Sequence, residues 1–257
     1  MTKIIALFNQ AGGVAKTTVT QNLGYHLSLR QHRVLLVDID PQASLTSFMG
    51  LEPADLDQTI YTALVPQNES TEEGLPIHKS VHGMDLVPAN ILLANAEQEL
   101  IFAELRELRL QQVLAPIQQD YDYILIDCPP SLGILSQISL VAANYVLVPI
   151  QCQFKALKGT DSLLNTVARV RKRLNPQLKI AGFLPTLFAT SNNLDKQTLV
   201  SLQQQLTQIA EVFPPIPRAT ALAEASAFGK PLALCPIKAP HILKLFDELA
   251  LSIETLP

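Results

Sequence analysis

The residues of this chain that could do chemistry begin with a loop near its start, "FNQAGGVAKTTVT" (residues 8–20). Gly12 and Gly13 let the backbone approach an anion closely and turn its N–H groups toward it. Lys16 can reach the β- and γ-phosphates of a nucleotide, and Thr17 can offer a hydroxyl to Mg²⁺. The loop stands between an apolar run and a helical pattern, the setting that a phosphate-binding loop requires. A plain structural turn is the alternative for this stretch taken alone.

Two further stretches place carboxylates where apolar runs end. In "VLLVDIDPQASLT", Asp38 and Asp40 occupy alternate positions of an extended segment and therefore point the same way, where a carboxylate can position water or hold a metal through water. In "YDYILIDCPPS", Asp127 ends a very apolar run, as an aspartate that holds Mg²⁺ does. Asp38 and Asp40 could also be solvated turn residues. The three stretches together nevertheless predict a nucleotide and metal site.

Apolar runs alternate with helical patterns along the whole chain. Strands are expected at Lys3–Phe8, Arg33–Asp38, Met84–Val87, Tyr123–Asp127, Tyr145–Pro149, Lys179–Leu184 and, more weakly, Val212–Ile216. Helices are expected at Thr17–Leu29, Ala96–Gln119, Ile134–Ala142, Ser162–Leu174, Asp195–Ala210 and His241–Ile253. Continuous apolar runs such as "YILI" indicate strands that are covered on both faces. We therefore expect an α/β fold, a doubly wound and mostly parallel β-sheet flanked by helices, as one domain over residues 1–257. Its ligands would bind at the carboxyl ends of the strands.

Composition excludes several classes of protein. No apolar run approaches the roughly 20 residues of a membrane span, and the first one is too short for a secretory signal. Cys128, Cys152 and Cys235 form no C-x-x-C pair, which argues against a zinc or iron–sulfur site and suits a reducing cytosol. The net charge of −4 argues against a globally basic nucleic-acid binder but leaves room for a local basic patch.

On the basis of these residues, the chain resembles the ParA/MinD family of deviant Walker ATPases. The stretches that carry the resemblance are "NQAGGVAKTTVTQNLGYHL", "VLLVDIDPQASLTSFMG", "YDYILIDCPPSLG", "YVLVPIQCQFKALKG" and "IPRATALAEASAFGKP". The family implies a P-loop NTPase fold, ATP and Mg²⁺ as cofactors, and homodimers that sandwich two nucleotides. Hydrolysis, often stimulated by an adaptor protein, dissolves the dimer. The ParA branch binds DNA nonspecifically in its ATP state and positions cargo over the nucleoid.

The resemblance also assigns roles to single residues. It makes Lys16 the phosphate-binding catalytic lysine, Asp40 the aspartate that positions water, and Thr17 and Asp127 the Mg²⁺ ligands, with Asp38 as a support beside the metal. Pro217 lies where the family lines the adenine pocket. The remaining nucleotide contacts fall on the loop itself, at Ala11, Gly12, Gly13, Val14, Ala15 and Thr18. An ordinary phosphate loop would have glycine in place of Gln10 and Ala15, but the deviant pattern K-G-G-x-x-K-[ST] does not require it.

The opening loop departs from that deviant pattern at Ala11. The family has a lysine there that reaches across the dimer to the partner's phosphates, and alanine cannot supply that charge. The segment "PIQCQFKALKG" has lysines where relatives carry an aromatic and an acid, so we expect Lys155 to be the relocated catalytic lysine, with Lys158 as the alternative. Loss of the first lysine is similar to the McdA branch, which distributes carboxysomes through the adaptor McdB. An orphan ParA that drifted the same way is the alternative.

The densest basic run is "ARVRKRLNPQLK". Arg169, Arg171, Lys172 and Arg173, joined by Arg218, are the candidate DNA-binding residues, and a solvated helix surface is the alternative. The C-terminal stretch "HILKLFDELALSIETLP" is amphipathic but acidic, so it is expected to pack and not to bind a membrane.

The expected function is an ATP-dependent dimerising ATPase that binds nonspecific DNA and positions a cargo, carboxysomes, through an McdB-like or ParB-like adaptor. Its expected location is cytoplasmic and nucleoid-associated. A plasmid or chromosome partition ATPase is the first alternative. A metabolic P-loop enzyme of the same fold is the second, although nothing in the sequence specifies a small-molecule substrate pocket.

Overall fold

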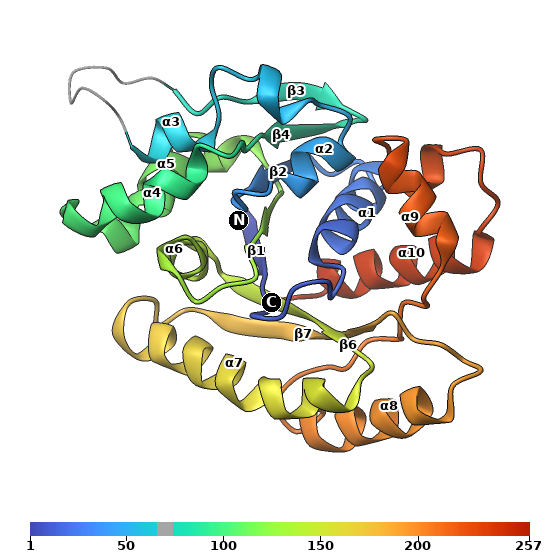
Figure 1. Ribbon diagram of the computed structural model, residues 1–257. Helices are drawn as coiled ribbons and strands as arrows, with labels where there is room; N and C mark the ends of the chain where they lie inside the picture. The colour runs from blue at the N-terminus through green and yellow to red at the C-terminus, as the bar shows by residue number, and fades with distance from the viewer. Residues whose placement is uncertain (66–73) are drawn as a thin grey trace.

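A computed structural model of the chain describes residues 1–65 and 74–257, with the backbone alone described for residues 154–158. In this part of the chain, one sheet runs in the order β3-β4-β2-β5-β1-β6-β7, and every neighbouring pair is parallel except β3 and β4 (Figure 1). The strands are β1 (Lys3–Leu7), β2 (Val34–Asp38), β3 (His78–Val81), β4 (Met84–Val87), β5 (Tyr123–Asp127), β6 (Tyr145–Gln151) and β7 (Lys179–Thr186). The predicted fold class, a doubly wound and mostly parallel α/β sheet, is confirmed.

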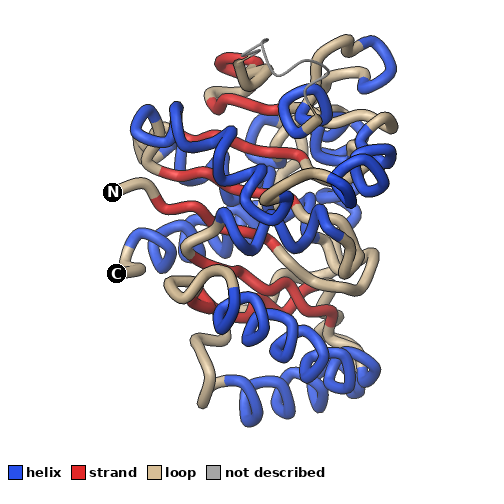
Figure 2. The backbone as a smooth tube through the Cα atoms, turned by 90° about the vertical axis from the view of Figure 1, so that its left-hand side faces the viewer, coloured by secondary structure: helices blue, strands red, loops and turns tan. Residues whose placement is uncertain are grey.

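Helices cover both faces of the sheet, and alternate residues of each strand serve the two cores (Figure 2). In β1, Ile4 and Ala6 belong to one core, while Ile5 and Leu7 belong to the other. The first core is covered by α3 (Ile60–Leu64), α4 (Leu93–Glu99), α5 (Arg109–Leu114), α6 (Ile134–Ala142), α7 (Phe154–Arg173) and α8 (Asn193–Leu206). The second is covered by α1 (Lys16–Leu29), α2 (Ser44–Phe48), α9 (Thr220–Ala227) and α10 (Pro240–Glu254).

The register of the three central strands brings their carboxyl ends level. Asp127, at the end of β5, pairs with Leu7 of β1 on one side and with Asp38 of β2 on the other. Because β5 lies between β1 and β2, motifs far apart in the sequence begin from one edge of the sheet. This edge is the ligand-binding end of a parallel sheet.

Several element predictions were wrong. The expected helix at Ala96–Gln119 is broken, since Ala103 is extended and Leu105 is left-handed at φ 51°. The weak strand at Val212–Ile216 makes only isolated bridges, in which Val212 pairs with Phe183. Neither β3 nor the short helices α2, α3 and α9 were predicted. The three helices are too short to show a clear helical period, which needs three or four turns of regular pattern.

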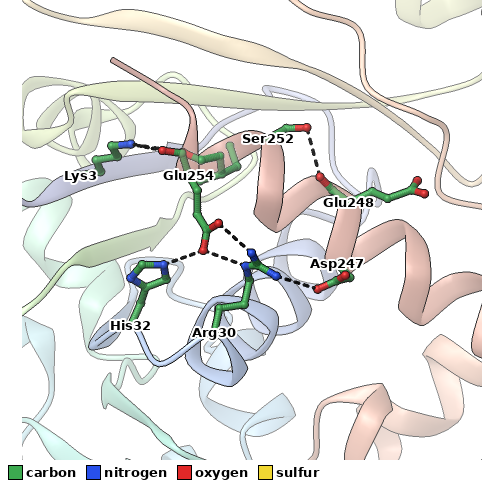
Figure 3. A network of polar contacts seen from close by, with 8 residues as sticks. Lys3, Arg30, His32, Asp247, Glu248, Ser252 and Glu254 are labelled. Carbon is green, nitrogen blue, oxygen red and sulfur yellow. Dashed lines mark hydrogen bonds and ion pairs between the residues drawn. The ribbon is translucent and has the colours of Figure 1, made fainter.

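A polar network joins the C-terminal helix to the amino end of the sheet (Figure 3). Glu254 Oε1 of α10 accepts a hydrogen bond from Arg30 Nε at 2.8 Å and lies 2.7 Å from His32 Nε2. Arg30 and His32 belong to the segment that follows α1. Lys3 Nζ donates to the Glu254 carbonyl oxygen at 2.8 Å, and Asp247 pairs with Arg30 at 3.5 Å. Asp247 and Glu254 therefore pair with residues that follow α1, and the apolar face of α10 packs in the second core, as expected for a packing helix. No helix of the described residues is long and apolar enough to cross a membrane.

Candidate nucleotide-binding site

The loop between β1 and α1 has a backbone shaped for an anion. Gly13 and Ala15 are left-handed, with φ 71° and φ 64°, and a Cβ added at Gly13 would meet nothing within 4 Å. None of the backbone N–H groups of residues 12–18 donates to an acceptor in the part of the chain that the structure describes. Free N–H groups at the start of a long helix form a nest in which a phosphate fits. The predicted residues Ala11, Gly12, Gly13, Val14, Ala15, Lys16, Thr17 and Thr18 make up this loop.

Lys16 points back over the loop. Its Nζ donates to the carbonyl oxygens of Asn9 and Ala11, at 3.1 Å each, and the residue is buried. Burial lowers the pKa of Lys16, and the nearby charge of Asp127 opposes this shift. A buried ammonium group that donates to neutral carbonyl oxygens would be stabilised by a charged phosphate oxygen as a further partner.

The Asp127 carboxylate accepts hydrogen bonds from two hydroxyl groups of α1. Thr17 Oγ1 donates to Asp127 Oδ2 at 2.7 Å, and Thr20 Oγ1 donates to Oδ1 at 3.2 Å. Burial raises the pKa of Asp127 to about 8, with a further contribution from the charge of Asp38. A divalent cation would favour the ionised carboxylate against the effect of burial, and a carboxylate beside a hydroxyl is an oxygen donor set that suits Mg²⁺. The residues present therefore fit the metal.

Asp38 is held by the protein itself. Its Oδ2 accepts hydrogen bonds from the backbone N–H and the hydroxyl of Thr46, at 2.8 and 2.7 Å, and its Oδ1 accepts from the Asp40 N–H at 3.2 Å. Burial raises the pKa of Asp38 to about 6. The same Thr46 hydroxyl accepts from the N–H of Ala89 after β4. These contacts favour a supporting role for Asp38 over direct metal binding.

Asp40 is the more available carboxylate of the pair. Its Oδ1 accepts from the backbone N–H of Gln42 at 3.0 Å, and its Oδ2 has no partner among the described residues. The residue is 9% exposed. A fixed carboxylate with one open oxygen can orient a water molecule.

The sequence prediction missed three residues of this region, of which Asn9 and Thr186 hold the loop in place. Asn9 binds the Ala11 N–H at 2.9 Å and the Pro149 carbonyl at 2.7 Å, and Thr186 at the end of β7 donates to the Val14 carbonyl at 3.1 Å. Thr20, which binds Asp127, is the third. For Thr20 a signal was available, since it lies one helical turn after Lys16 and so on the same face.

Other predicted residues lie farther along the chain. Pro217 pairs with Phe188, two residues beyond the end of β7, and the Arg218 N–H donates to the Phe188 carbonyl at 3.0 Å. The side chains of Lys155 and Lys158 lie outside the described residues. The backbone of that segment forms the first turns of α7, where Gly159 lines a 230 Å³ cavity together with Ala11.

The basic run occupies the last turns of α7. Arg169 and Arg173 line one cavity with residues of α6, but Arg171 and Lys172 do not. At about 100° per residue, Arg171 lies about 200° around the helix from Arg169. The four candidate DNA-binding residues on α7 therefore do not share a single face of the helix.

Comparisons with known proteins show the family of the chain. A family model described as an AAA domain matches residues 2–180. The sporulation initiation inhibitor protein Soj of Bacillus subtilis is 44% identical over 235 residues, which cover 91% of each chain. The chain belongs to the ParA/MinD family of P-loop ATPases. The chromosome partitioning protein ParA of Myxococcus xanthus is 40% identical over 92% of this chain and 82% of that relative.

Solved structures of the family share the fold. A cobyrinic acid a,c-diamide synthase from Mycobacterium smegmatis, solved with ADP and magnesium, is 38% identical at a TM-score of 0.79, covering 89% of this chain and 93% of that one. An ATP complex of McdA from Cyanothece has a TM-score of 0.86 at 22% identity, covering 100% and 98% of the two chains. The McdA likeness concerns the fold alone.

Proposed function

We propose that this protein is a Mg²⁺-dependent ATP hydrolase that dimerises around ATP, binds DNA without sequence preference in that state, and positions a cargo through an adaptor that stimulates hydrolysis. The observation that carries the proposal is the meeting of the phosphate loop, Asp40 and the Thr17–Asp127 pair at one edge of the sheet. Its action is cytoplasmic and over the nucleoid.

Each residue has a distinct task in this proposal. The free N–H groups of the loop and Lys16 bind the phosphates, and Thr17 with Asp127 would hold Mg²⁺. The metal, when bound, neutralises charge that develops on the phosphates. Asp40 orients the attacking water through its open oxygen. Pro217 lines the side on which the base would lie.

A missing cation distinguishes this loop from the family pattern. Ala11 cannot stabilise charge on the partner's phosphates, and we propose that Lys155 does so, with Lys158 as the alternative. The cavity shared by Ala11 and Gly159 supports this assignment, because it brings the start of α7 beside the phosphate loop.

The Lys155→Ala variant tests the relocated lysine. It is expected to lose ATP-dependent dimerisation in sedimentation-velocity runs, since a trans contact to phosphate is removed, while keeping ATP binding in equilibrium titrations. Lys158→Ala is the matched control and should dimerise normally. Normal dimerisation of Lys155→Ala would contradict the assignment, and loss in Lys158→Ala alone would transfer it to Lys158.

DNA binding is proposed for the basic residues near the end of α7, Arg169, Arg171, Lys172 and Arg173, with Arg218. Dimerisation would bring two such sets together on an otherwise acidic chain. Binding of plasmid-length DNA should require ATP and fall about tenfold or more as salt rises from about 50 to 200 mM, since it depends on phosphate contacts. ATP-loaded protein that leaves DNA free at low salt would refute this part.

The cargo has two candidates. The departure at Ala11 favours carboxysomes and an McdB-like adaptor. The names of two relatives at 40% and 37% identity, both chromosome partitioning proteins, favour instead the partition alternative, for a chromosome or a plasmid, with a ParB-like adaptor. An Asp40→Ala variant, held in its ATP state and pulled down from native cells, should retain the adaptor for mass spectrometry. The 38% identical synthase keeps a metabolic reaction as the further alternative, which ATPase stimulation by DNA and adaptor would oppose.

A further inference from the structure

A groove lies between α6 and α7, on the opposite side of α7 from Arg171. Its volume is about 270 Å³. Asn175, two residues after the end of α7, donates to the carbonyl oxygens of Leu140, Val141 and Ala143 at 3.1, 3.0 and 2.7 Å. These three bonds tie the end of α7 to the end of α6, so the groove is built into the fold.

The floor of the groove is apolar. Leu140 and Val170 are buried at its base, while Leu132, in the loop before α6, is 54% exposed at its rim. An apolar side chain of another molecule that covered this exposed leucine and the hollow beside it would bury apolar surface, which is favourable.

The charges of the groove are all positive. Arg169 and Arg173 lie one turn apart along α7, and neither has a carboxylate partner within the described part of the chain. No residue that lines the groove is acidic. Two unpaired guanidinium groups above an apolar floor are complementary to carboxylates carried on an apolar helix face.

We propose that this groove binds an acidic amphipathic segment of a partner protein, with leucine-like side chains in the hollow and carboxylates on Arg169 and Arg173. The proposal rests on the adaptor-dependent function proposed above and gives that adaptor a docking surface and a charge. This narrows the DNA assignment proposed above to Arg171, Lys172 and Arg218 and gives Arg169 and Arg173 to the acidic segment. DNA is the less suitable occupant of the groove, because a phosphate backbone would leave the apolar floor uncovered. A DNA surface would also draw equally on Arg171 and Lys172, which lie outside the groove.

The groove is connected to the phosphate loop. Thr166 lines it, and Gln10 Nε2 donates to Thr166 Oγ1 at 3.4 Å. Ser162, one turn earlier on the same face of α7, donates to Gln10 Oε1 at 3.2 Å. A segment seated in the groove therefore contacts a helix face that also contacts the residue next to Ala11. A docked partner could therefore act on the phosphate-binding loop through the contacts of Thr166 and Ser162 with Gln10.

The test uses direct binding to the full chain in the presence of ATP. The probes are two fluorescein-labelled peptides with leucines at helical spacing, one with glutamates and one with lysines at the intervening positions. Fluorescence anisotropy should show that the glutamate peptide binds and the lysine peptide does not. The double variant R169E/R173E should lose the glutamate peptide by about tenfold or more and gain the lysine peptide. Leu132→Ser should weaken the glutamate peptide about threefold or more.

The matched control is R171E/K172E, which makes the same change of charge on the same helix. It should bind the glutamate peptide as the parent does, and ATP binding is measured on every variant to separate loss of the groove from loss of the nucleotide site. Equal loss in both double variants, absence of the charge exchange, or unchanged binding in Leu132→Ser would overturn the proposal. Displacement of the glutamate peptide by DNA only when Arg171 and Lys172 are present would assign the helix to DNA instead.

Discussion

At the scale of single residues, the Asp127 carboxylate depends on two threonines one turn apart on α1. Thr17 Oγ1 binds one carboxylate oxygen at 2.7 Å and Thr20 Oγ1 binds the other at 3.2 Å. The Thr17 hydroxyl is the one that would turn to Mg²⁺ when nucleotide binds. Thr20 also donates to the Lys16 carbonyl, so it orients Asp127 from a fixed position. Outer groups of this kind set the direction of a metal ligand.

We therefore expect Thr20→Val to weaken Mg²⁺-nucleotide binding about tenfold, because Asp127 loses the hydroxyl that orients it. Titration of a fluorescent ATP analogue with Mg²⁺ and with EDTA measures this. Ser28→Ala removes a hydroxyl from the same helix, which among the described residues donates to the Tyr25 carbonyl alone, and it should leave Mg²⁺-nucleotide binding unchanged. An equal loss for Thr20→Val in EDTA would point to the loop and not to the metal.

At the scale of elements, β7 depends on the close approach of the segment that follows α8. The Phe183 N–H donates to the Glu211 carbonyl at 2.8 Å, and the Phe213 N–H donates to the Phe183 carbonyl at 2.9 Å. Gly182 makes this approach possible, since an added Cβ would lie 2.9 Å from the Glu211 carbonyl oxygen and against the Phe213 ring. Because the Glu211 carbonyl is part of the backbone, it cannot move away from an added methyl group by a change of rotamer.

Gly182→Ala is expected to lower the free energy of unfolding by about 1–3 kcal/mol, because the methyl group overpacks this contact. The control is Gly159→Ala in α7, where an added Cβ meets nothing within 4 Å. That change should raise the free energy of unfolding by about 0.5–1 kcal/mol through helix propensity. Urea unfolding followed by circular dichroism compares the two, and a Gly182→Ala protein as stable as its parent would contradict the packing argument.

At the scale of the whole molecule, the network around Glu254 closes the fold by joining the two ends of the chain. Lys3 belongs to the first strand and Glu254 to the last helix, and both termini lie on the same side of the molecule (Figures 2 and 3). The hydrogen bond from Arg30 holds the pKa of Glu254 below its usual value, against a smaller opposing effect of burial.

This shift gives stability a pH dependence of known sign. A carboxyl group whose pKa is lower in the folded state stabilises the protein above its unfolded pKa, near 4.5. That contribution is lost as the pH falls through the lower folded value. Glu254→Gln should therefore melt up to about 3 °C below the parent at pH 7, and the difference should shrink below pH 4 or so. Calorimetry across this range checks it, and a difference that does not vary with pH would exclude the ion pair as its cause.

Local features of the sequence were enough to predict most of the secondary structure, and they also predict the part of the proposed nucleotide site that one protomer supplies. A phosphate-binding loop is predicted by Gly12, Gly13, Lys16 and Thr17, because their chemistry and spacing act within one loop and one helix turn. The broken helix around Leu105 was not predictable in this way, since leucine repeats continue through it and only its tertiary surroundings impose the left-handed turn.

The sequence by itself determined that this chain has a phosphate loop, carboxylates at strand ends, and alanine where the family pattern has a lysine. Only the tertiary structure decided that β5 lies between β1 and β2, which brings Asp127 level with Asp38. It also decided that Thr186 and Asn9 hold the loop, and that Arg169 and Arg173 share a groove that excludes Arg171. The physical reason is that strand order, register and side-chain pairing depend on contacts between residues far apart in the chain, which short-range pattern and propensity do not encode.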